Sequence, residues 1–323
     1  MQRYRDILCV VEPGELYGQA LERAVTLAEN NQASLTVAAV APHVTAGIGM
    51  PDGGPISADL QAAVVSAHTQ GLENLVDPYR SRMEIETKVL TGTPFLEIIH
   101  EVQRHGHDLV IKVPEISDWL DRLFGSDDMH LLRKCPCPVW LIKPGKPKAY
   151  RCILAAVDVD DTYPPGELDT RHALNRQILE MACSLALSEF AELHIVHAWE
   201  VMPESALREM FLHTPEEKII VYADQARRRH TINLDTLIHE VAGNLGKDTL
   251  DYLKPHTHLV KGWARREIPG LVKQIDADLV VMGTVARTGI PGFIMGNTAE
   301  TILNQIDCSV LAIKPPGFVT PVV

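Results

Sequence analysis

Two halves of this 323-residue chain carry the same run of sequence. The residues DLVIK that begin at Asp108 return as DLVVM at Asp278, which lies 170 positions later. Gly92 and Gly262 are separated by the same 170 positions, so the match extends well beyond one segment. A period of this length is that of a whole domain, because solenoid repeats span only about 20–50 residues. We therefore predict two domains of one kind, covering residues 1–147 and 148–323.

In each half, short apolar runs alternate with longer segments whose apolar residues recur at helical spacing. The expected strands are 7–11, 34–41, 84–90, 108–112 and 139–143, then 153–157, 193–198, 256–261, 279–282 and 310–314. The expected helices are 16–30, 57–78, 94–105 and 127–134, then 169–187, 228–252, 267–275 and 298–305. Continuous apolar strands between helices indicate a parallel sheet covered on both faces. The predicted fold class is α/β, with two tandem doubly wound domains of five parallel strands, flavodoxin-like and three-layered.

The composition limits the classes of protein to which the chain can belong. With 46% hydrophobic and 22% charged residues, the chain has the balance of a globular protein. No apolar run approaches the roughly 20 residues that a membrane helix needs. The start, MQRYRDILCVV, lacks the long apolar region of a signal peptide. A formal net charge of −12 disfavours nucleic-acid binding, which requires a basic face. We expect a cytoplasmic protein that binds neither membranes nor nucleic acids.

Catalytic and metal-binding patterns are not evident in the sequence. The glycine and serine patterns of hydrolase elbows, P-loops and dinucleotide-binding turns do not occur. Cys135 and Cys137 form a C-x-C pair with no second cysteine or histidine cluster at metal spacing. The histidine pairs 105/107, 194/197 and 256/258 also have no carboxylate cluster at zinc spacing. We expect no metal site, no disulfide framework and no catalytic nucleophile.

Glycines punctuate the segment between the fourth strand and the next helix of the second half, from Gly283 to Thr298. Such glycines let backbone N–H groups approach a phosphate closely and tolerate positive φ. Gly296 and Asn297 then open a helix, whose free N–H groups favour an anion. Asn297 and Glu300 have the spacing of a capping pair. The same residues would also serve a tight strand-to-helix turn that binds no ligand.

The spacing of this segment resembles the G-x2-G-x9-G motif of nucleotide-binding members of the universal stress protein family. Gly283 and Gly296 stand at the first and last glycines of the motif, and Ala286 takes the place of the middle one. The resemblance covers nearly the whole chain in two copies, as in tandem members of that family, whose domains have an adenine nucleotide alpha hydrolase-like fold. It implies a site for ATP or another adenine nucleotide in the second domain. The residues that it assigns to adenine, ribose and phosphates are Asp158, Ala198, Met282, Gly283, Ala286, Gly296, Asn297 and Thr298.

The second copy departs from the family motif at two positions. Ala286 adds a methyl group where glycine lets the loop approach, and if φ is positive there the strain is about 1–2 kcal/mol. Asn297 replaces a hydroxyl residue with a bulkier amide, which still offers its backbone N–H. Both changes weaken the expectation of a nucleotide at this site.

The first copy departs further from the motif. The place of Gly283 falls on Lys112 or Val113, depending on where a one-residue gap lies, and Glu115 follows. Glu12 stands at the position of Asp158, while Gly125 and Ser126 survive from the motif. A carboxylate near a phosphate site repels the ligand. We therefore expect one candidate nucleotide site per chain, in the second domain.

The resemblance also implies an arrangement and a role. Members of the family pair through their last strands, so residues 139–143 and 310–314 are expected to meet in an internal pseudo-dimer. A homodimer of the tandem chain is a further expected assembly. The implied role is stress resistance, including survival of DNA-damaging agents. It is exerted through binding and regulation, with very slow ATP hydrolysis as the most catalysis expected.

Two hypotheses of different class remain open. In the first, the second domain is an adenine-nucleotide switch that protein partners sense. In the second, the domains hold an apolar metabolite or a partner protein between the loops at residues 43–56 and 201–218. Asp158 and the two motif glycines favour the first hypothesis, whereas Ala286 and Glu12 favour the second.

Overall fold

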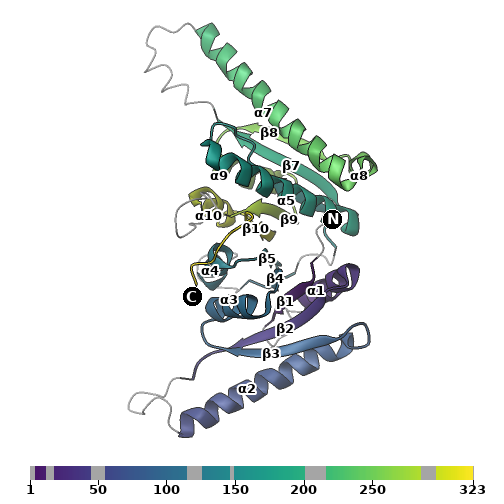
Figure 1. Ribbon diagram of the computed structural model, residues 1–323, viewed down its shortest axis with the longest axis vertical. Helices are drawn as coiled ribbons and strands as arrows, with labels where there is room; N and C mark the ends of the chain where they lie inside the picture. Colours follow the sequence, from purple (N-terminus) through teal and green to yellow (C-terminus); the bar gives the residue numbers. More distant parts are fainter. Residues whose placement is uncertain are drawn as a thin grey trace. The chain divides into compact units, whose positions relative to one another are not determined.

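The computed structural model describes residues 4–11, 18–44, 55–114, 126–145, 149–200, 216–284 and 296–322. They form two compact units, called here the N-terminal unit (mainly residues 3–148, with 309–312 and 318–323) and the C-terminal unit (mainly residues 149–308 and 313–317). The N-terminal unit holds β1 (Asp6–Val10), α1 (Gly18–Asn31), β2 (Ser34–Ala41), α2 (Pro55–Val76), η2 (Asp77–Tyr79), β3 (Ile85–Thr91), α3 (Pro94–His105), β4 (Leu109–Lys112), α4 (Ser126–Lys134) and β5 (Val139–Leu141). The C-terminal unit holds β6 (Cys152–Ala156), α5 (Pro165–Glu189), β7 (Glu192–Trp199), α7 (Glu216–Leu245), α8 (Lys247–Leu253), β8 (His256–Lys261), α9 (Ala264–Gln274), β9 (Leu279–Gly283) and α10 (Asn297–Leu303). The last strand, β10 (Ser309–Ile313), follows α10 (Figure 1).

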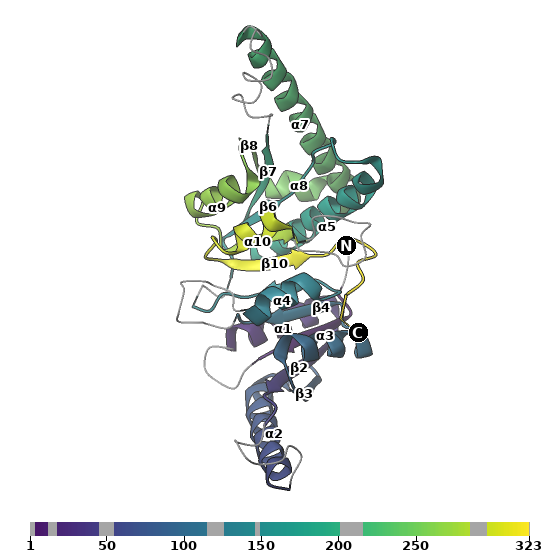
Figure 2. The ribbon, with the colours of Figure 1, turned by 90° about the vertical axis from the view of Figure 1, so that its left-hand side faces the viewer.

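Each unit is built on a parallel sheet. The strand order is β3-β2-β1-β4-β5 in the N-terminal unit and β8-β7-β6-β9 in the C-terminal unit, and every one of these pairs is parallel. Consecutive residues of the central strands, such as Ile7, Leu8 and Cys9, are all buried, so both faces of the sheet are covered. Figure 2 shows α1 and α3 on opposite sides of the first sheet, and α5 and α9 on opposite sides of the second. The predicted doubly wound α/β fold is confirmed.

Asp108 and Asp278, the first residues of the repeated DLV sequence, make equivalent hydrogen bonds to the backbone in the two units. Asp108 accepts hydrogen bonds from the backbone N–H groups of Arg5 and Asp6, at 2.7 and 3.2 Å. Asp278 accepts the equivalent bonds from Arg151 and Cys152, at 2.8 and 3.2 Å. Each carboxylate thereby ties the start of the fourth strand to the start of the first, which fixes the register of the central pair. The repeated DLV sequence encodes this connection.

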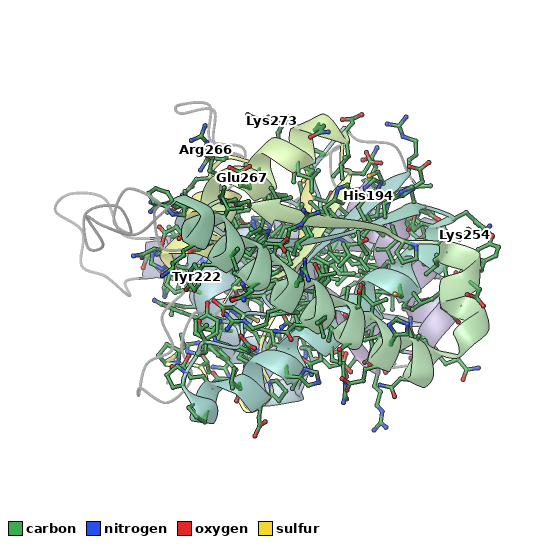
Figure 3. The ribbon with its side chains drawn as sticks, turned by 90° about the horizontal axis from the view of Figure 1, so that it is seen from above. His194, Tyr222, Lys254, Arg266, Glu267 and Lys273 are labelled. Atoms are coloured by element: carbon green, nitrogen blue, oxygen red, sulfur yellow. The ribbon has the colours of Figure 1, made fainter. Side chains whose placement is uncertain are left out.

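The repeated glycines have a shared conformational reason. Gly92 and Gly262 follow the third strand of their units with φ of 144° and 142°, a region that other residues rarely adopt. A Cβ on Gly262 would also lie 2.8 Å from the carboxylate of Glu267, in the first turn of α9 (Figure 3), and Gly92 meets Glu97 in the same way. These glycines turn the chain from the strand into the next helix.

The last strand pairs as the sequence predicts. The first four residues of β10 belong to the N-terminal unit, where they pair antiparallel with β5. Val310 lies opposite Leu141, and Leu311 lies opposite the buried Trp140. The backbone N–H of Lys143 donates to Ser309 Oγ at 3.0 Å. The expected meeting of the two last strands is therefore confirmed.

One helix differs from its prediction. The structure extends the helix expected at 228–252 back to Glu216 and interrupts it at Gly246, which has φ 95°. The added residues Ile220 and Tyr222 are exposed, so they give no pattern of a buried face (Figure 3). No helix among the described residues has the length and apolarity that crossing a membrane requires.

Candidate functional site

A pocket of about 460 Å³ lies in the C-terminal unit, where parallel-sheet folds bind their ligands. Its floor is formed by the residues at and after the carboxyl ends of β6, β7 and β9, and its walls by α5, α9 and α10. Seven of the eight residues that the sequence assigned to the site line it: Asp158, Ala198, Met282, Gly283, Gly296, Asn297 and Thr298. The eighth, Ala286, lies outside the described residues, as do Glu12, Glu115, Gly125 and most of both predicted loops.

Asp158, assigned to the adenine, is held in place by its backbone and its side chain. Asn175 on α5 accepts the Asp158 N–H at 3.0 Å and donates to its carbonyl oxygen at 2.6 Å. The carboxylate accepts the Tyr163 hydroxyl at 2.8 Å and the Arg171 guanidinium at 3.2 Å. Arg171 also stacks on the Tyr163 ring, 3.4 Å from its centroid. These three partners of Asp158 were not foreseen, because no local spacing relates them to it.

Gly283 has a packing reason that the sequence did not predict, while the positive φ that glycine would tolerate is not found there. Its φ is not in the positive region, so the backbone does not require glycine there. A Cβ at this position would lie 2.7 Å from Cδ2 of Leu174, which lines the pocket from α5. Gly283 therefore lets α5 approach the end of β9, and a side chain would push Leu174 into the cavity.

The predicted capping pair is wrong. Gly296 is the residue before α10, with an extended backbone, and no side chain caps the helix. Asn297 is the first residue inside the helix, and the backbone N–H of Glu300 bonds to Gly296 O at 3.0 Å. Asn297 and Thr298 are exposed, so their polar side chains are available at the pocket rim.

The N-terminal unit fills the matching place with a buried ion pair. Lys112 and Met282 are the fourth residues of β4 and β9, so Val113 corresponds to Gly283 and the earlier ambiguity is resolved. Lys112 Nζ lies 2.8 Å from Asp128 Oδ1, and both side chains are at most 5% exposed. Asp128 is the third residue of α4, as Ala299 is of α10. Charged side chains thus occupy the positions of two pocket-lining residues.

Two buried histidines support the pocket from behind. His197 on β7 points Nδ1 at the carbonyl oxygen of Val157, 3.2 Å away. Its Nε2 lies 3.0 Å from Nδ1 of His230 on α7. Burial lowers the pKa of both histidines, against the opposing effect of nearby carboxylates such as Asp158 on His197 and Asp160 on His230. The pair joins α7 to the strand end that carries Asp158.

This pair makes stability depend on pH. Because the folded-state pKa is lower than the unfolded value of about 6.5, the unfolded chain binds more protons in the window just below that value. The free energy of unfolding should therefore fall as the pH drops from about 7.5 to about 5.5. Urea unfolding at the two pH values measures the loss, and His197→Gln should reduce it. His43→Gln, a change at an exposed histidine after β2 in the N-terminal unit, is the control.

The cysteines have a structural character. All six are free and buried. Burial raises the pKa of Cys9 to about 12. The hydrogen bond with Cys135, followed by burial, raises the pKa of Cys137, and the two sulfur atoms lie 3.6 Å apart. Since the thiolate is the reactive form, these thiols are poor nucleophiles.

Comparison with known proteins agrees with this architecture. The profile of the Universal stress protein family matches residues 3–143 and 168–314. Universal stress protein E of Escherichia coli K12 is 32% identical over 330 residues, covering 100% of this chain and 98% of that protein. The Haemophilus influenzae homolog of that protein is 30% identical over 325 residues, covering 97% and 98%.

Solved structures show the same fold. A putative universal stress protein from Pseudomonas aeruginosa UCBPP-PA14 has a TM-score of 0.68 and 28% identity, over 97% of this chain and 94% of that one. A universal stress protein from Archaeoglobus fulgidus, at 17% identity, shares the fold with a TM-score of 0.59 over 96% and 98% of the two chains. With the family profile matched twice in tandem, the chain belongs to the universal stress protein family and is a stress-response protein.

Proposed function

We propose that this chain is a regulatory stress-response protein that binds an adenine nucleotide, with ATP the first candidate, in the pocket of the C-terminal unit. One observation carries the proposal: a single pocket collects seven of the eight residues that the family motif assigns to the nucleotide. The protein acts in the cytoplasm by binding and signalling to partners, not by fast catalysis. Resistance to DNA-damaging agents is part of the same proposal.

The charges of the pocket suit a nucleotide in one orientation. The carboxylates of Asp158, Asp160 and Glu200 follow β6 and β7. Among the described residues, those that open α10, from Gly296 to Thr298, are uncharged. An adenine amino group can donate to the Asp158 carboxylate, which Tyr163, Arg171 and the Asp160 N–H already hold in place. Phosphates at the other end of the pocket avoid repulsion from it. The base therefore lies toward Asp158 and the phosphates toward Gly296.

A second candidate is supported by the apolar part of the same wall. Leu174, Ile178, Ile268 and Ile302 line the pocket, and the Asp158 carboxylate already bonds to Arg171 and Tyr163. An apolar metabolite could occupy this space without displacing those bonds. A segment of a partner protein is a third candidate for the same space. With either occupant, the affinity of the pocket for a nucleotide would be low.

Nucleotide binding is tested on the full chain by thermal unfolding and by mass spectrometry of ligand released from denatured protein. At about a hundredfold excess over Kd, ATP should stabilise the unit by about 2.7 kcal/mol, which raises Tm by roughly 5–10 °C. Asp158→Ala should abolish the shift. Asp235→Ala, at an exposed position of α7 outside the pocket, should keep it.

The same measurements can also contradict nucleotide binding. A chain purified without nucleotide that shows no Tm rise with ATP, ADP or AMP contradicts the nucleotide proposal. Release of a lipid-like metabolite would then support the apolar candidate. If Ala286→Gly combined with Asn297→Ser created ATP binding in that case, the two departures from the family motif would be the cause of its absence.

A further inference from the structure

A second group of side chains, in the N-terminal unit, has the composition of a metal site. Glu101, His105 and His107 each offer one ligand atom, and these atoms lie within 4.8 Å of one another. Glu101 and His105 are one turn apart near the end of α3, and His107 follows two residues later. This group, called here the His-His-Glu cluster, shares no residue with the pocket of the C-terminal unit.

The buried histidine has a ring nitrogen that forms no hydrogen bond and lies 3.5 Å from Glu101 Oε1. His107 is 4% exposed, and its Nε2 makes no hydrogen bond. Its Nδ1 bonds to the Asp6 carboxylate. A carboxylate can only accept, so Nδ1 carries a proton, and in the neutral imidazole Nε2 then carries a lone pair. A histidine oriented by a carboxylate, with its other nitrogen free, is the arrangement found in metal-binding histidines.

The two distances from the Glu101 carboxylate are close to those between ligands of one ion, and all three donor atoms lie within 4.8 Å of one another. Glu101 Oε1 lies 3.0 Å from His105 Nδ1 and 3.5 Å from His107 Nε2. Tetrahedral zinc binds nitrogen and oxygen at about 2.0–2.1 Å, which places adjacent donor atoms about 3.3 Å apart. Small side-chain rotations therefore suffice to bring the three atoms around one ion, and a water molecule would complete the four positions.

A glycine brings the third ligand into place. Gly106 ends α3 with φ 77° and ψ 26°, and its N–H bonds to Val102 O at 2.9 Å. An added Cβ would meet nothing within 4 Å, so glycine is needed for the backbone angle and not for space. This left-handed turn directs the chain back under the helix, where His107 is buried beside Glu101.

The other copy of the domain shows that the fold does not need these polar residues. At the 170-residue offset, the cluster corresponds to Leu271, Ile275 and Ala277. Leu271 and Ala277 are buried apolar residues at the end of α9 and before β9. The C-terminal unit packs this part of the fold with apolar side chains. The N-terminal unit has a buried histidine nitrogen without a hydrogen bond at the same place, and such a group lowers the stability of the fold.

Lys88 competes with a metal ion for the Glu101 carboxylate. Its Nζ lies 2.8 Å from Glu101 Oε1 and 3.3 Å from His105 Nε2. The ammonium group balances the buried carboxylate when no cation is bound. The Lys88 side chain is 23% exposed and its Nζ already lies 3.3 Å from Glu86. Its flexible chain can therefore turn toward Glu86 and leave Glu101 to a metal ion.

We propose that Glu101, His105 and His107 bind one divalent cation of the zinc class, with Asp6 orienting His107 and Lys88 opposing the ion. Two imidazoles and one carboxylate favour zinc over magnesium or calcium, which prefer oxygen ligands alone. Ion binding replaces the Lys88–Glu101 pair and fastens α3 to the starts of β1 and β4. It does not depend on the nucleotide proposal, because the two sites lie in different units.

The full chain, freed of metal by a chelator, is titrated with Zn²⁺ by calorimetry and with Co²⁺ by visible absorption. Wild type should bind Zn²⁺ with a rise in Tm and give a tetrahedral Co²⁺ spectrum. His105→Ala, an exposed change that should not disturb folding, should remove both. Asp6→Asn should weaken binding by roughly 10–100-fold, as loss of an orienting carboxylate does. Lys88→Met should tighten it.

The matched control is His100→Ala, which removes a histidine from the same helix outside the cluster and should leave binding unchanged. A second control is His256→Ala, because His194, His256 and His258 form another histidine group, on β7 and β8. The proposal is overturned if wild type shows no Zn²⁺ response. It is also overturned if His105→Ala binds as wild type does, or if His256→Ala alone removes the signal.

Discussion

Lys112→Met is expected to lower the free energy of unfolding by about 3–5 kcal/mol, because it removes the ammonium group that lies beside the buried Asp128 carboxylate. Asp128 is fully buried, and Lys112 Nζ lies 2.8 Å from its Oδ1. Removing one member of a buried ion pair lowers stability by far more than the intact pair contributes to it. Urea unfolding of the full chain, with wild type beside the variant, measures the loss.

The matched rescue is the double variant Lys112→Met with Asp128→Ala. These are the residues that the C-terminal unit has at the same places, Met282 and Ala299. Removing both charges leaves no uncompensated ion, so the double variant should recover stability to within about 1–2 kcal/mol of wild type. A double variant as unstable as Lys112→Met alone would show that volume, not charge, causes the loss.

The ion pair marks a chemical difference between the two copies of the domain. In the C-terminal unit, Met282 and Ala299 leave room for a ligand at the end of the sheet. In the N-terminal unit, Lys112 and Asp128 neutralise each other in the equivalent space. A nucleotide there would have to displace a charge pair that is already satisfied. The prediction of one nucleotide site per chain thus gains a structural reason that is independent of Glu12 and Glu115.

Regular elements were predictable because their signal is local. The spans 34–41, 94–105 and 256–261 are strands and a helix with the bounds that the sequence predicts. Periodicity failed for α7, whose first turns expose apolar residues such as Tyr222. The sequence did not predict the break between α7 and α8 at Gly246, because a glycine within a helical pattern does not by itself indicate a positive φ.

The sequence motif predicted the pocket residues that follow the strands, but not the residues of other elements that contact them. Residues after parallel strands meet at one edge of a sheet, so Asp158 and Gly296 were expected together. The reason for Gly283 required the position of Leu174 on α5, more than a hundred residues earlier. The His-His-Glu cluster was missed although Glu101 and His105 are one turn apart, because a metal-binding third histidine depends on the left-handed turn at Gly106.

The repeated aspartate provides the other large effect, since in each unit it accepts hydrogen bonds from two backbone N–H groups at the start of the first strand. In the C-terminal unit, Arg151 N–H and Cys152 N–H both donate to Oδ2 of Asp278, whose side chain is fully buried. In the N-terminal unit, the equivalent groups of Arg5 and Asp6 donate to different oxygens of Asp108. An asparagine side chain has one carbonyl oxygen, so it can replace the first arrangement fully and the second only in part.

Asp278→Ala is therefore expected to lower the free energy of unfolding by about 2–6 kcal/mol, because two backbone N–H groups lose their acceptor at about 1–3 kcal/mol each. Asp278→Asn should cost clearly less, since one amide oxygen can accept both bonds. Asp108→Asn, the matched change in the other unit, should lose one of its two bonds. Urea unfolding of the three variants tests the order. Equal losses for Asp278→Asn and Asp278→Ala would show that the negative charge, not the shared acceptor, holds β6 to β9.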